Sequence, residues 1–207
     1  MSRLLQVTNL RYQPGPGVDI RYPDFSINEG DIVAVEGANG TGKTTLLFLL
    51  AGLYSPCSAD SIQYSVDASG TANRKRNISC GLSLPGVGEN PGITGKALVK
   101  SAKALSGTGD SEVRKVLTGS GVEEFWSRRY GSLSTGQQLR VKLVQAFIAH
   151  GPLILLDEPT NGLDSRGVDW LQGLIDSAST RGRAVLVTNH DDQLNFNKRL
   201  VIGEETQ

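Results

Sequence analysis

The sequence predicts an α/β fold in which a parallel sheet forms the core and helices flank it. Three apolar runs carry this prediction: DIVAVEG (31–37), PLILLDEP (152–159) and AVLVTNH (184–190). Each run lacks polar alternation and leads into polar residues, a pattern typical of parallel strands that are covered on both faces. Open α/β sheets bind their ligands at the carboxyl ends of the strands. The polar residues that follow each run are therefore the candidates for a functional site.

Two further segments complete the predicted architecture. Residues 3–28 alternate more strongly and contain Gly and Pro, which favours an N-terminal antiparallel β appendage. Residues 94–130 hold short helical patterns, with Thr94 and Asp110 as expected N-caps, and indicate a small helical insert. We expect one domain over residues 1–207, with a core at 1–93 and 131–207 and a helical subdomain at about 94–130.

The composition limits the function classes. The 207 residues are 38% hydrophobic, and 21 basic side chains balance 21 acidic ones, so no net field attracts nucleic acid or an acidic membrane surface. The one basic run, NRKRN (73–77), is typical of a solvated loop, and no nucleic-acid partner is expected. Two cysteines without metal-ligand spacing indicate a reducing compartment, the cytoplasm. No apolar stretch reaches the length of a membrane span, so a membrane role requires a partner.

The segment GANGTGKTT (37–45) has the spacing G-x-x-x-x-G-K-[ST] of a phosphate-binding P-loop, between a predicted strand and a predicted helix. Its glycines allow backbone amides to point at phosphate oxygens, and the positive end of the following helix adds to the attraction. Lys43 is expected to reach the β- and γ-phosphates, and the Thr44 hydroxyl is a ligand for Mg²⁺. The expected nucleotide-binding residues of the loop are Asn39, Gly40, Thr41, Gly42, Lys43, Thr44 and Thr45.

The run LILLDEP supplies the carboxylates that a triphosphate site needs. Asp157 ends the predicted strand and is the expected metal ligand, together with Thr44. Glu158 follows where the strand has ended, so its side chain can face an attacking water as general base. An Asp-Glu pair can also be a simple solvated strand exit, but four apolar residues and a P-loop in the same chain favour the catalytic interpretation.

The P-loop, the segment LSTGQ (133–137) and the segment LLDEPTNGLDS (155–165) occur in an order that resembles the nucleotide-binding subunit of the ABC (ATP-binding cassette) family. The similarity covers nearly the whole chain, and the short length resembles the single-module subunits of bacterial exporters. The resemblance implies a P-loop NTPase core and a dimer in which LSTGQ, the signature loop, caps the ATP held on the partner's P-loop. By this resemblance Ser134, Gly136 and Gln137 bind that ATP, and Asp164 in GLDS (162–165) meets the partner's P-loop.

Two further site residues and one departure follow from the resemblance. His190 corresponds to the histidine that touches the γ-phosphate, and Tyr12 is the candidate for stacking on adenine, although a tyrosine there can equally serve packing. The family carries a glutamine after the strand near 78–84, yet the aligned position is about Pro85 or Gly86. Either Asn90 or Glu89 substitutes for it or the contact is absent, so metal coordination and coupling are in question here, whereas ATP binding is not.

The expected function is an ATPase subunit that binds ATP and Mg²⁺, dimerises with itself or a homologous subunit, and powers an integral membrane transporter subunit. Its expected location is the cytoplasmic face of the cell membrane. Two alternatives remain open from the sequence: a soluble ABC ATPase that serves cofactor assembly or a similar task, and an ATP-binding subunit with weak hydrolysis.

Overall fold

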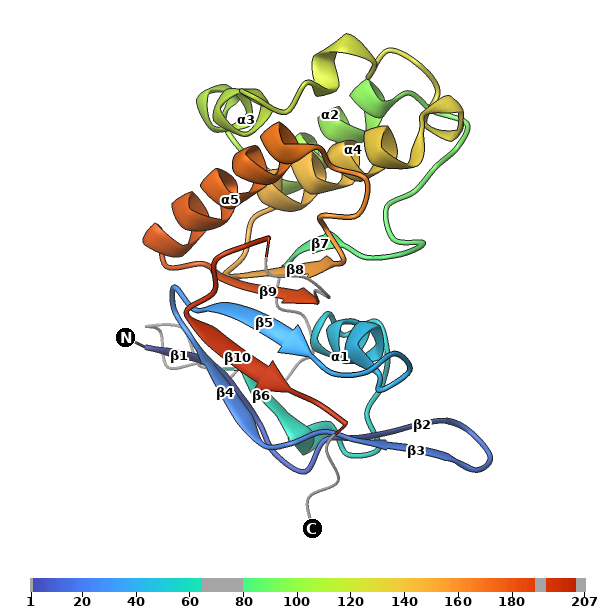
Figure 1. Cartoon of the computed structure of the whole chain (residues 1–207), viewed down its shortest axis with the longest axis vertical. Helices are drawn as coiled ribbons and strands as arrows, with labels where there is room; N and C mark the ends of the chain where they lie inside the picture. Colours follow the sequence, from blue (N-terminus) through green and yellow to red (C-terminus); the bar gives the residue numbers. More distant parts are fainter. Residues whose placement is uncertain (1, 65–79, 189–192, 204–207) are drawn as a thin grey trace.

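A computed structural model describes residues 2–64, 80–188 and 193–203. Within these residues the centre of the molecule is a five-stranded parallel sheet in the order β10-β5-β9-β8-β7 (Figure 1). The strands are β5 (Ile32–Glu36), β7 (Cys80–Ser83), β8 (Leu153–Asp157), β9 (Ala184–Thr188) and β10 (Lys198–Val201). The three apolar runs of the sequence form β5, β8 and β9, so the predicted parallel core is confirmed.

The N-terminal segment is antiparallel, as the sequence predicts. β1 (Arg3–Val7) pairs on one side with β4 (Phe25–Asn28) and on the other with β6 (Ile62–Tyr64). β6 follows the first helix in the chain. β2 (Arg11–Gly15) and β3 (Val18–Arg21) form a separate hairpin. In Figure 1 this hairpin extends away from the body of the protein.

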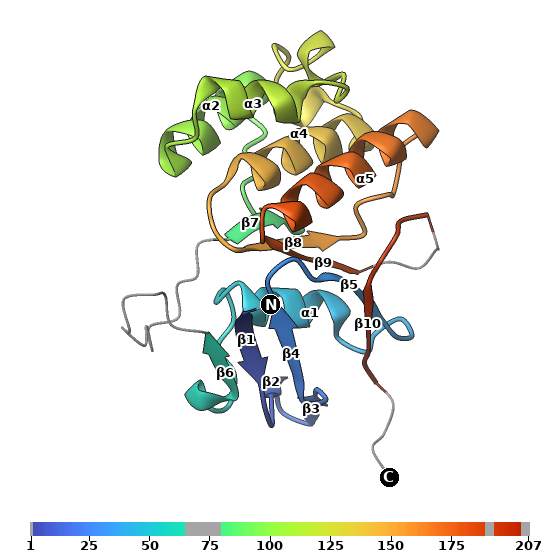
Figure 2. The same ribbon diagram turned by 90° about the vertical axis from the view of Figure 1, so that its left-hand side faces the viewer.

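The helices lie on both faces of the parallel sheet. α4 (Thr135–Ile148) and α5 (Ser165–Thr180) lie on one face, and α2 (Gly95–Ser106) and α3 (Asp110–Leu117) pack on α4 beyond them (Figures 1 and 2). α1 (Lys43–Leu50) lies on the opposite face, between the parallel sheet and the β4-β1-β6 sheet. Short 3-10 turns occur at Ala59–Ser61, Val122–Glu124 and Tyr130–Ser132. In the described part of the chain, no helix combines the length and apolarity needed to cross a membrane.

Each face of the sheet has its own hydrophobic cluster, because successive side chains of a strand point to opposite faces. In β8, Ile154 and Leu156 pack with α4 and α5, whereas Leu153 and Leu155 pack with the leucines of α1. Asp157 is the next residue of the second series. The alternation therefore brings this carboxylate to the face of the sheet that α1 covers.

One of the two expected N-caps is confirmed and the other is wrong. The Thr94 side chain accepts a hydrogen bond of 3.2 Å from the backbone N–H of Ala97 and caps α2. Gly109, in extended conformation, is the N-cap of α3, and Asp110 is the first residue inside that helix. The Asp110 carboxylate forms an ion pair with Lys103 of α2, which draws the side chain away from the capping position.

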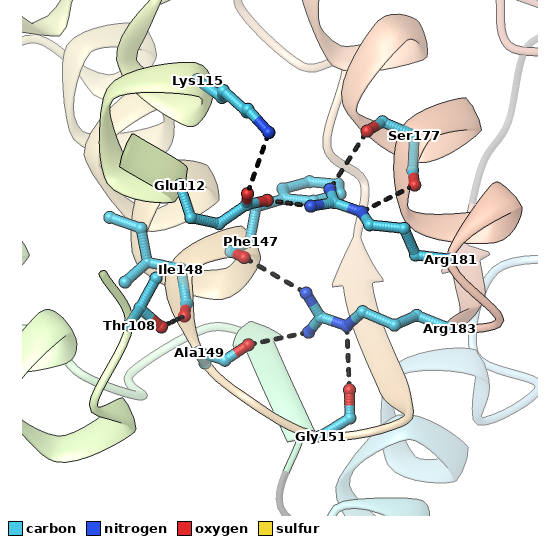
Figure 3. Close-up of polar contacts among 10 residues, drawn as sticks. All are labelled: Thr108, Glu112, Lys115, Phe147, Ile148, Ala149, Gly151, Ser177, Arg181 and Arg183. Atoms are coloured by element: carbon cyan, nitrogen blue, oxygen red, sulfur yellow. Dashed lines mark hydrogen bonds and ion pairs between the residues drawn. The ribbon is translucent and has the colours of Figure 1, made fainter. Parts of the chain in front are cut away.

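The C-terminal end of α4 is fastened to the parallel sheet by Arg183, just before β9 (Figure 3). Its guanidinium donates three hydrogen bonds to carbonyl oxygens, at 3.1 Å to Phe147, 2.9 Å to Ala149 and 2.8 Å to Gly151. Burial lowers the pKa of Arg183 to about 10, so the side chain remains cationic at neutral pH. It satisfies carbonyls at a helix end that have no partner within the helix.

A second connection lies beside the first. Arg181, at the C-terminal end of α5, forms an ion pair with Glu112 of α3 (Figure 3). The Thr108 hydroxyl, in the turn between α2 and α3, donates to the carbonyl of Ile148 at 2.7 Å. The helices of the insert are thus tied to the ends of both α4 and α5.

We predict that Arg183→Met lowers the free energy of unfolding by roughly 3 kcal/mol, because three carbonyl groups lose a charged donor in a largely enclosed site. The matched control is Arg181→Met, since this neighbouring side chain is 44% exposed and its ion pair is worth less than about 1 kcal/mol. Urea denaturation of both variants measures the difference. Equal losses in the two variants would contradict a special role for Arg183.

Candidate functional site

The P-loop connects the end of β5 to the start of α1 (Figure 1). Ala38, Asn39 and Gly40 are exposed at its tip, whereas Lys43 is only 7% exposed. The Lys43 ammonium donates to the carbonyl oxygens of Gly37 at 2.7 Å and Ala38 at 3.1 Å. The charge lies inside the loop, where phosphate oxygens can replace these two carbonyls as acceptors.

The base of the P-loop rests on Tyr22, a residue that the sequence analysis did not select. Gly42 has φ +95°, and a Cβ on it would lie 2.8 Å from the Tyr22 hydroxyl oxygen, so this position requires glycine. That hydroxyl donates to the Gly42 carbonyl at 3.0 Å. Burial raises the pKa of Tyr22, which therefore stays neutral. Thr41 closes the loop from within by donating to the Ala38 carbonyl at 2.9 Å.

The structure brings Thr44 and Asp157 together, although 113 residues separate them in the chain. The Thr44 hydroxyl lies 3.0 and 3.1 Å from the two carboxylate oxygens of Asp157. A third side chain joins them, because the Thr188 hydroxyl at the end of β9 donates to Asp157 Oδ1 at 2.7 Å. Thr188 was not a sequence candidate, since its buried run offers no motif that marks it.

Glu158 follows Asp157 in an unusual backbone conformation. Its φ of +45° is in the left-handed region, which is uncommon for residues other than glycine. Its backbone N–H points at Thr188, 3.2 Å from the carbonyl oxygen and 3.0 Å from the hydroxyl oxygen. The Glu158 carboxylate accepts a hydrogen bond from the Asn161 side-chain amide. Asn161, like Tyr22 and Thr188, is a residue that the sequence analysis did not select.

The signature loop starts α4. Ser134 is the N-cap: its side chain accepts from the backbone N–H of Gln137 at 3.3 Å, and the Gln137 side chain accepts from the Ser134 N–H at 3.2 Å. This reciprocal pair is a capping box, which aligns the first amides of the helix. Ser134 and Gln137, two of the three residues predicted to contact ATP, thus also have a local structural role at the helix end.

The signature loop packs directly on the GLDS loop of the same chain. A Cβ on Gly136 would lie 2.5 Å from the carbonyl oxygen of Gly162, so only glycine permits this approach. Asp164 caps α5 by accepting from the Gly167 N–H at 2.9 Å, and it pairs with Arg140 of α4 at 2.6 Å. The Gly167 amide, and then the Arg140 guanidinium, hold the pKa of Asp164 below its usual range.

The predicted site residues therefore form two groups on opposite faces of the sheet. One group comprises the P-loop and Asp157, at the end of the sheet beside the start of α1. The other comprises the signature and GLDS loops at the starts of α4 and α5 (Figures 1 and 2), and Glu158 is linked to it through Asn161. α1 and α4 belong to the separate hydrophobic clusters of these two faces.

Tyr12 belongs to a stack of aromatic rings. It lies parallel to Tyr54, with ring centroids 5.3 Å apart, and Tyr54 in turn stacks on Phe48 of α1 at 4.8 Å. One face of the Tyr12 ring is thus covered by protein. Its stacking on adenine stays a prediction. His190 lies outside the described residues, as does the basic run 73–77.

The loop that follows β7 contains the two candidate substitutes for the missing glutamine, and both have partners nearby. The Glu89 carboxylate accepts from Lys142 of α4 at 2.8 Å and from the Gly86 N–H at 3.0 Å. The Lys142 ammonium lowers the pKa of Glu89, and it also donates to the carbonyl of Leu84 at 2.6 Å. The Asn90 side chain accepts from the Gly92 N–H at 3.0 Å. The structure thus ties this loop to α4.

Thr44 and Asp157 fit a magnesium ion that is held mainly by a nucleotide. Mg²⁺ in such sites takes one or two protein oxygens and completes its shell with phosphates and water. A hydroxyl and a carboxylate within hydrogen-bond distance of each other, at the start of a helix, supply that donor set. Among the described residues, no cluster of three or more His, Cys, Asp and Glu side chains could hold a metal without a nucleotide.

Comparison with known proteins identifies the family that shares these motifs. The family model described as ABC transporter matches residues 20–161, which include the P-loop, the signature loop and both carboxylates. The chain belongs to the ABC transporter family. It is also 32% identical over 194 residues to the SkfA peptide export ATP-binding protein SkfE of Bacillus subtilis (strain 168), covering 91% of this chain and 79% of that protein.

Solved structures of ABC proteins share the fold. The dimeric post-hydrolysis structure of the ATP-binding cassette MJ0796, bound to ADP and Pi, has a TM-score of 0.75 at 23% identity and covers 96% of this chain and 94% of that one. The RNase-L Inhibitor has a TM-score of 0.71 at 20% identity, and the match spans 92% of this chain but only 34% of that chain. As a member of the ABC family, the protein is an ATP-binding subunit and an ATPase.

We predict that Gly136→Ala destabilises this ABC subunit by about 1–3 kcal/mol, because its methyl group would overlap the Gly162 carbonyl oxygen. The control is Gly173→Ala in α5, where a Cβ would meet no atom within 4 Å. This second change should stabilise the protein by about 0.5–1 kcal/mol, since alanine restricts the unfolded chain and favours the helix. Thermal or urea unfolding compares the two. A neutral Gly136→Ala would refute the close contact of the two loops.

Proposed function

We propose that the protein is the ATP-hydrolysing subunit of a membrane exporter and that it works as a nucleotide-dependent dimer. The dimer proposal rests on one observation: within one chain, the P-loop and the signature loop lie on opposite faces of the sheet. Two chains in antiparallel contact allow the signature loop of each to complete the ATP site of the other. The dimeric arrangement of the MJ0796 cassette supports this choice.

The P-loop residues Asn39 to Thr45 bind the ATP phosphates through backbone amides and the Lys43 ammonium. Thr44 and Asp157 would hold Mg²⁺, which offsets charge on the phosphate oxygens when it is bound. Across the dimer, Ser134, Gly136 and Gln137 contact the γ-phosphate, and Asp164 faces the partner's P-loop. We assign Tyr12 to stacking on the adenine ring and His190 to contact with the γ-phosphate.

Hydrolysis requires a water molecule in line with the bond between the γ-phosphorus and the bridging oxygen. The Glu158 carboxylate orients this water and accepts its proton while the oxygen–phosphorus bond forms and the bond to ADP breaks. The Lys43 ammonium stabilises the charge that develops on the phosphate oxygens. In the described structure Asn161 holds the Glu158 carboxylate beside the GLDS loop. The acid–base group is therefore connected to the loop that faces the second subunit.

The proposals of an export role and of a membrane partner are based on a similar protein of known role. SkfE is named a peptide export ATP-binding protein, and it is 32% identical over most of both chains. On this ground we propose that the ATPase dimer attaches to a separate integral membrane subunit, on the cytoplasmic side of the cell membrane. The helical insert at about 94–130 and the adjacent loop at 84–93 form the proposed attachment region.

We predict that Glu158→Gln retains ATP binding but lowers the turnover number at least 10²-fold, because the proton acceptor is lost. With Mg²⁺ and ATP this variant should accumulate as a dimer, since bound ATP stabilises the assembled state and is no longer consumed. Phosphate release measures the turnover, and sedimentation with and without ATP measures the mass.

The control for the same measurements is Lys43→Ala, which should weaken ATP binding itself and remain monomeric. Near-normal turnover of Glu158→Gln would remove this residue from the role of base. A mass that ATP does not change would reject the dimer, whatever the turnover.

We predict that the protein, at its native expression level, cosediments with cell membranes and copurifies with an integral membrane protein. Carbonate or high-salt washing should release it, because the attachment is through protein contacts rather than through an inserted span. Quantitative immunoblotting of the two fractions measures the distribution. Complete recovery in the soluble fraction, with no membrane protein bound, would favour the soluble non-transport ATPase instead.

A further inference from the structure

Thr188 ends the middle strand of the parallel sheet. β9 lies between β5, which leads into the P-loop, and β8, which ends in Asp157. Thr188 is in register with Val35 of β5 on one side and with Asp157 on the other. Its side chain is fully buried, at 0% exposure. The residue thus lies between the two motifs without belonging to either.

The single hydroxyl of Thr188 makes two hydrogen bonds that fix its orientation. It donates its only proton to Asp157 Oδ1 at 2.7 Å, and it accepts the backbone N–H of Glu158 at 3.0 Å. A hydroxyl has one donor, so the bond to a carboxylate determines which lone pair faces Glu158. The same carboxylate receives the Thr44 hydroxyl at 3.0 Å. Asp157 is therefore held from the helix side and from the strand side.

The second bond acts on the backbone of Glu158. A φ of +45° costs a non-glycine residue about 1 kcal/mol or more and persists only where neighbouring contacts impose it. Both acceptors of the Glu158 N–H, the carbonyl and the hydroxyl, belong to Thr188. The direction in which the Glu158 side chain leaves the chain depends on this peptide. Asn161 then holds the far end of that side chain.

We propose that Thr188 is a positioning residue for ATP hydrolysis, whose one hydroxyl orients both the Asp157 carboxylate and the Glu158 backbone. Thr188 acts through these neighbours and makes no contact of its own with ATP. The inference rests on the proposed roles of Asp157 in Mg²⁺ binding and of Glu158 as base. A purely structural threonine would satisfy the same two groups, so the test requires readouts that stability alone does not change.

The experiment compares Thr188→Val, which keeps the shape and removes the hydroxyl, with Thr188→Ser, which keeps the hydroxyl. We expect Thr188→Val to lower kcat about 10- to 100-fold, which is the usual effect of removing a hydrogen bond that orients a metal ligand. The KM for ATP should stay within about threefold of the unmodified protein's value. In a titration with Mg²⁺, the Mg²⁺ concentration that gives half of the increase in binding of a fluorescent ATP analogue should be about 10-fold higher in this variant. Without Mg²⁺ the affinity should stay within about twofold. Thr188→Ser should recover both quantities to within about threefold.

Three outcomes would overturn the proposal. One is a Thr188→Val protein with reduced stability in urea but unchanged kcat and Mg²⁺ dependence. Another is a Thr188→Ser protein as impaired as Thr188→Val, because the effect would then not come from the hydroxyl. The third is a loss of Mg²⁺-free ATP binding equal to the loss of kcat. Thr188→Ala repeats the comparison with a smaller side chain if the valine variant does not fold.

The Glu158→Gln background separates this proposal from the function on which it rests. There, Thr188→Val should still raise the Mg²⁺ requirement for nucleotide binding, because Asp157 remains, but should lower the residual turnover by less than about threefold. A full additive loss of turnover would show that Thr188 does not act through Glu158. If Glu158→Gln alone retains normal turnover, the proposed base is wrong, while the effect of Thr188 on Mg²⁺ is still measured.

Discussion

All strands of the described central sheet run in the same direction, and the rest of the molecule depends on this constraint. Parallel strands bring their carboxyl ends to one edge, so the P-loop, Asp157 and Thr188 meet there although they are distant in the chain. The pleat adds a second condition, since every other side chain of a strand points to the same face. Asp157 and Thr188 therefore both face α1, whose first turn carries Thr44.

The edge of the sheet concentrates polar groups within an apolar interior, and almost every one has a partner. Lys43 bonds to carbonyls of its own loop, Thr188 satisfies two neighbours, and Tyr22 supports the P-loop from below. Such groups are costly when they are unpaired in a medium of low polarity, so a connected network holds each member in one geometry. The Asn161 side chain links the adjacent GLDS loop to this edge of the sheet by donating to the Glu158 carboxylate.

α4 connects three parts of the molecule. Its first turn carries the signature loop and packs on the GLDS loop, where Gly136 meets the Gly162 carbonyl. Lys142, near its middle, holds the loop that follows β7. Its last turn is fastened by Arg183 in front of β9. A helix that is fixed at one end and in contact with two loops along its length links their positions, so none of the three parts can shift without affecting the others.

The sequence by itself determined the parallel core, the P-loop and the pair Asp157 and Glu158, because each depends on residues that are close together in the chain. Apolar runs, glycine spacing and the cap at Thr94 are local patterns, and each determines the backbone conformation of its own segment. Only the tertiary structure decided that Thr188 holds Asp157, that Tyr22 lies under the P-loop, and that Asp110 pairs with Lys103 instead of capping its helix. The physical reason is that these contacts depend on the strand order β10-β5-β9-β8-β7, which differs from the order in the chain, and on the packing of separate helices. No local pattern specifies which strand lies between two others, and the side chains at that edge acquire their partners only when the sheet assembles.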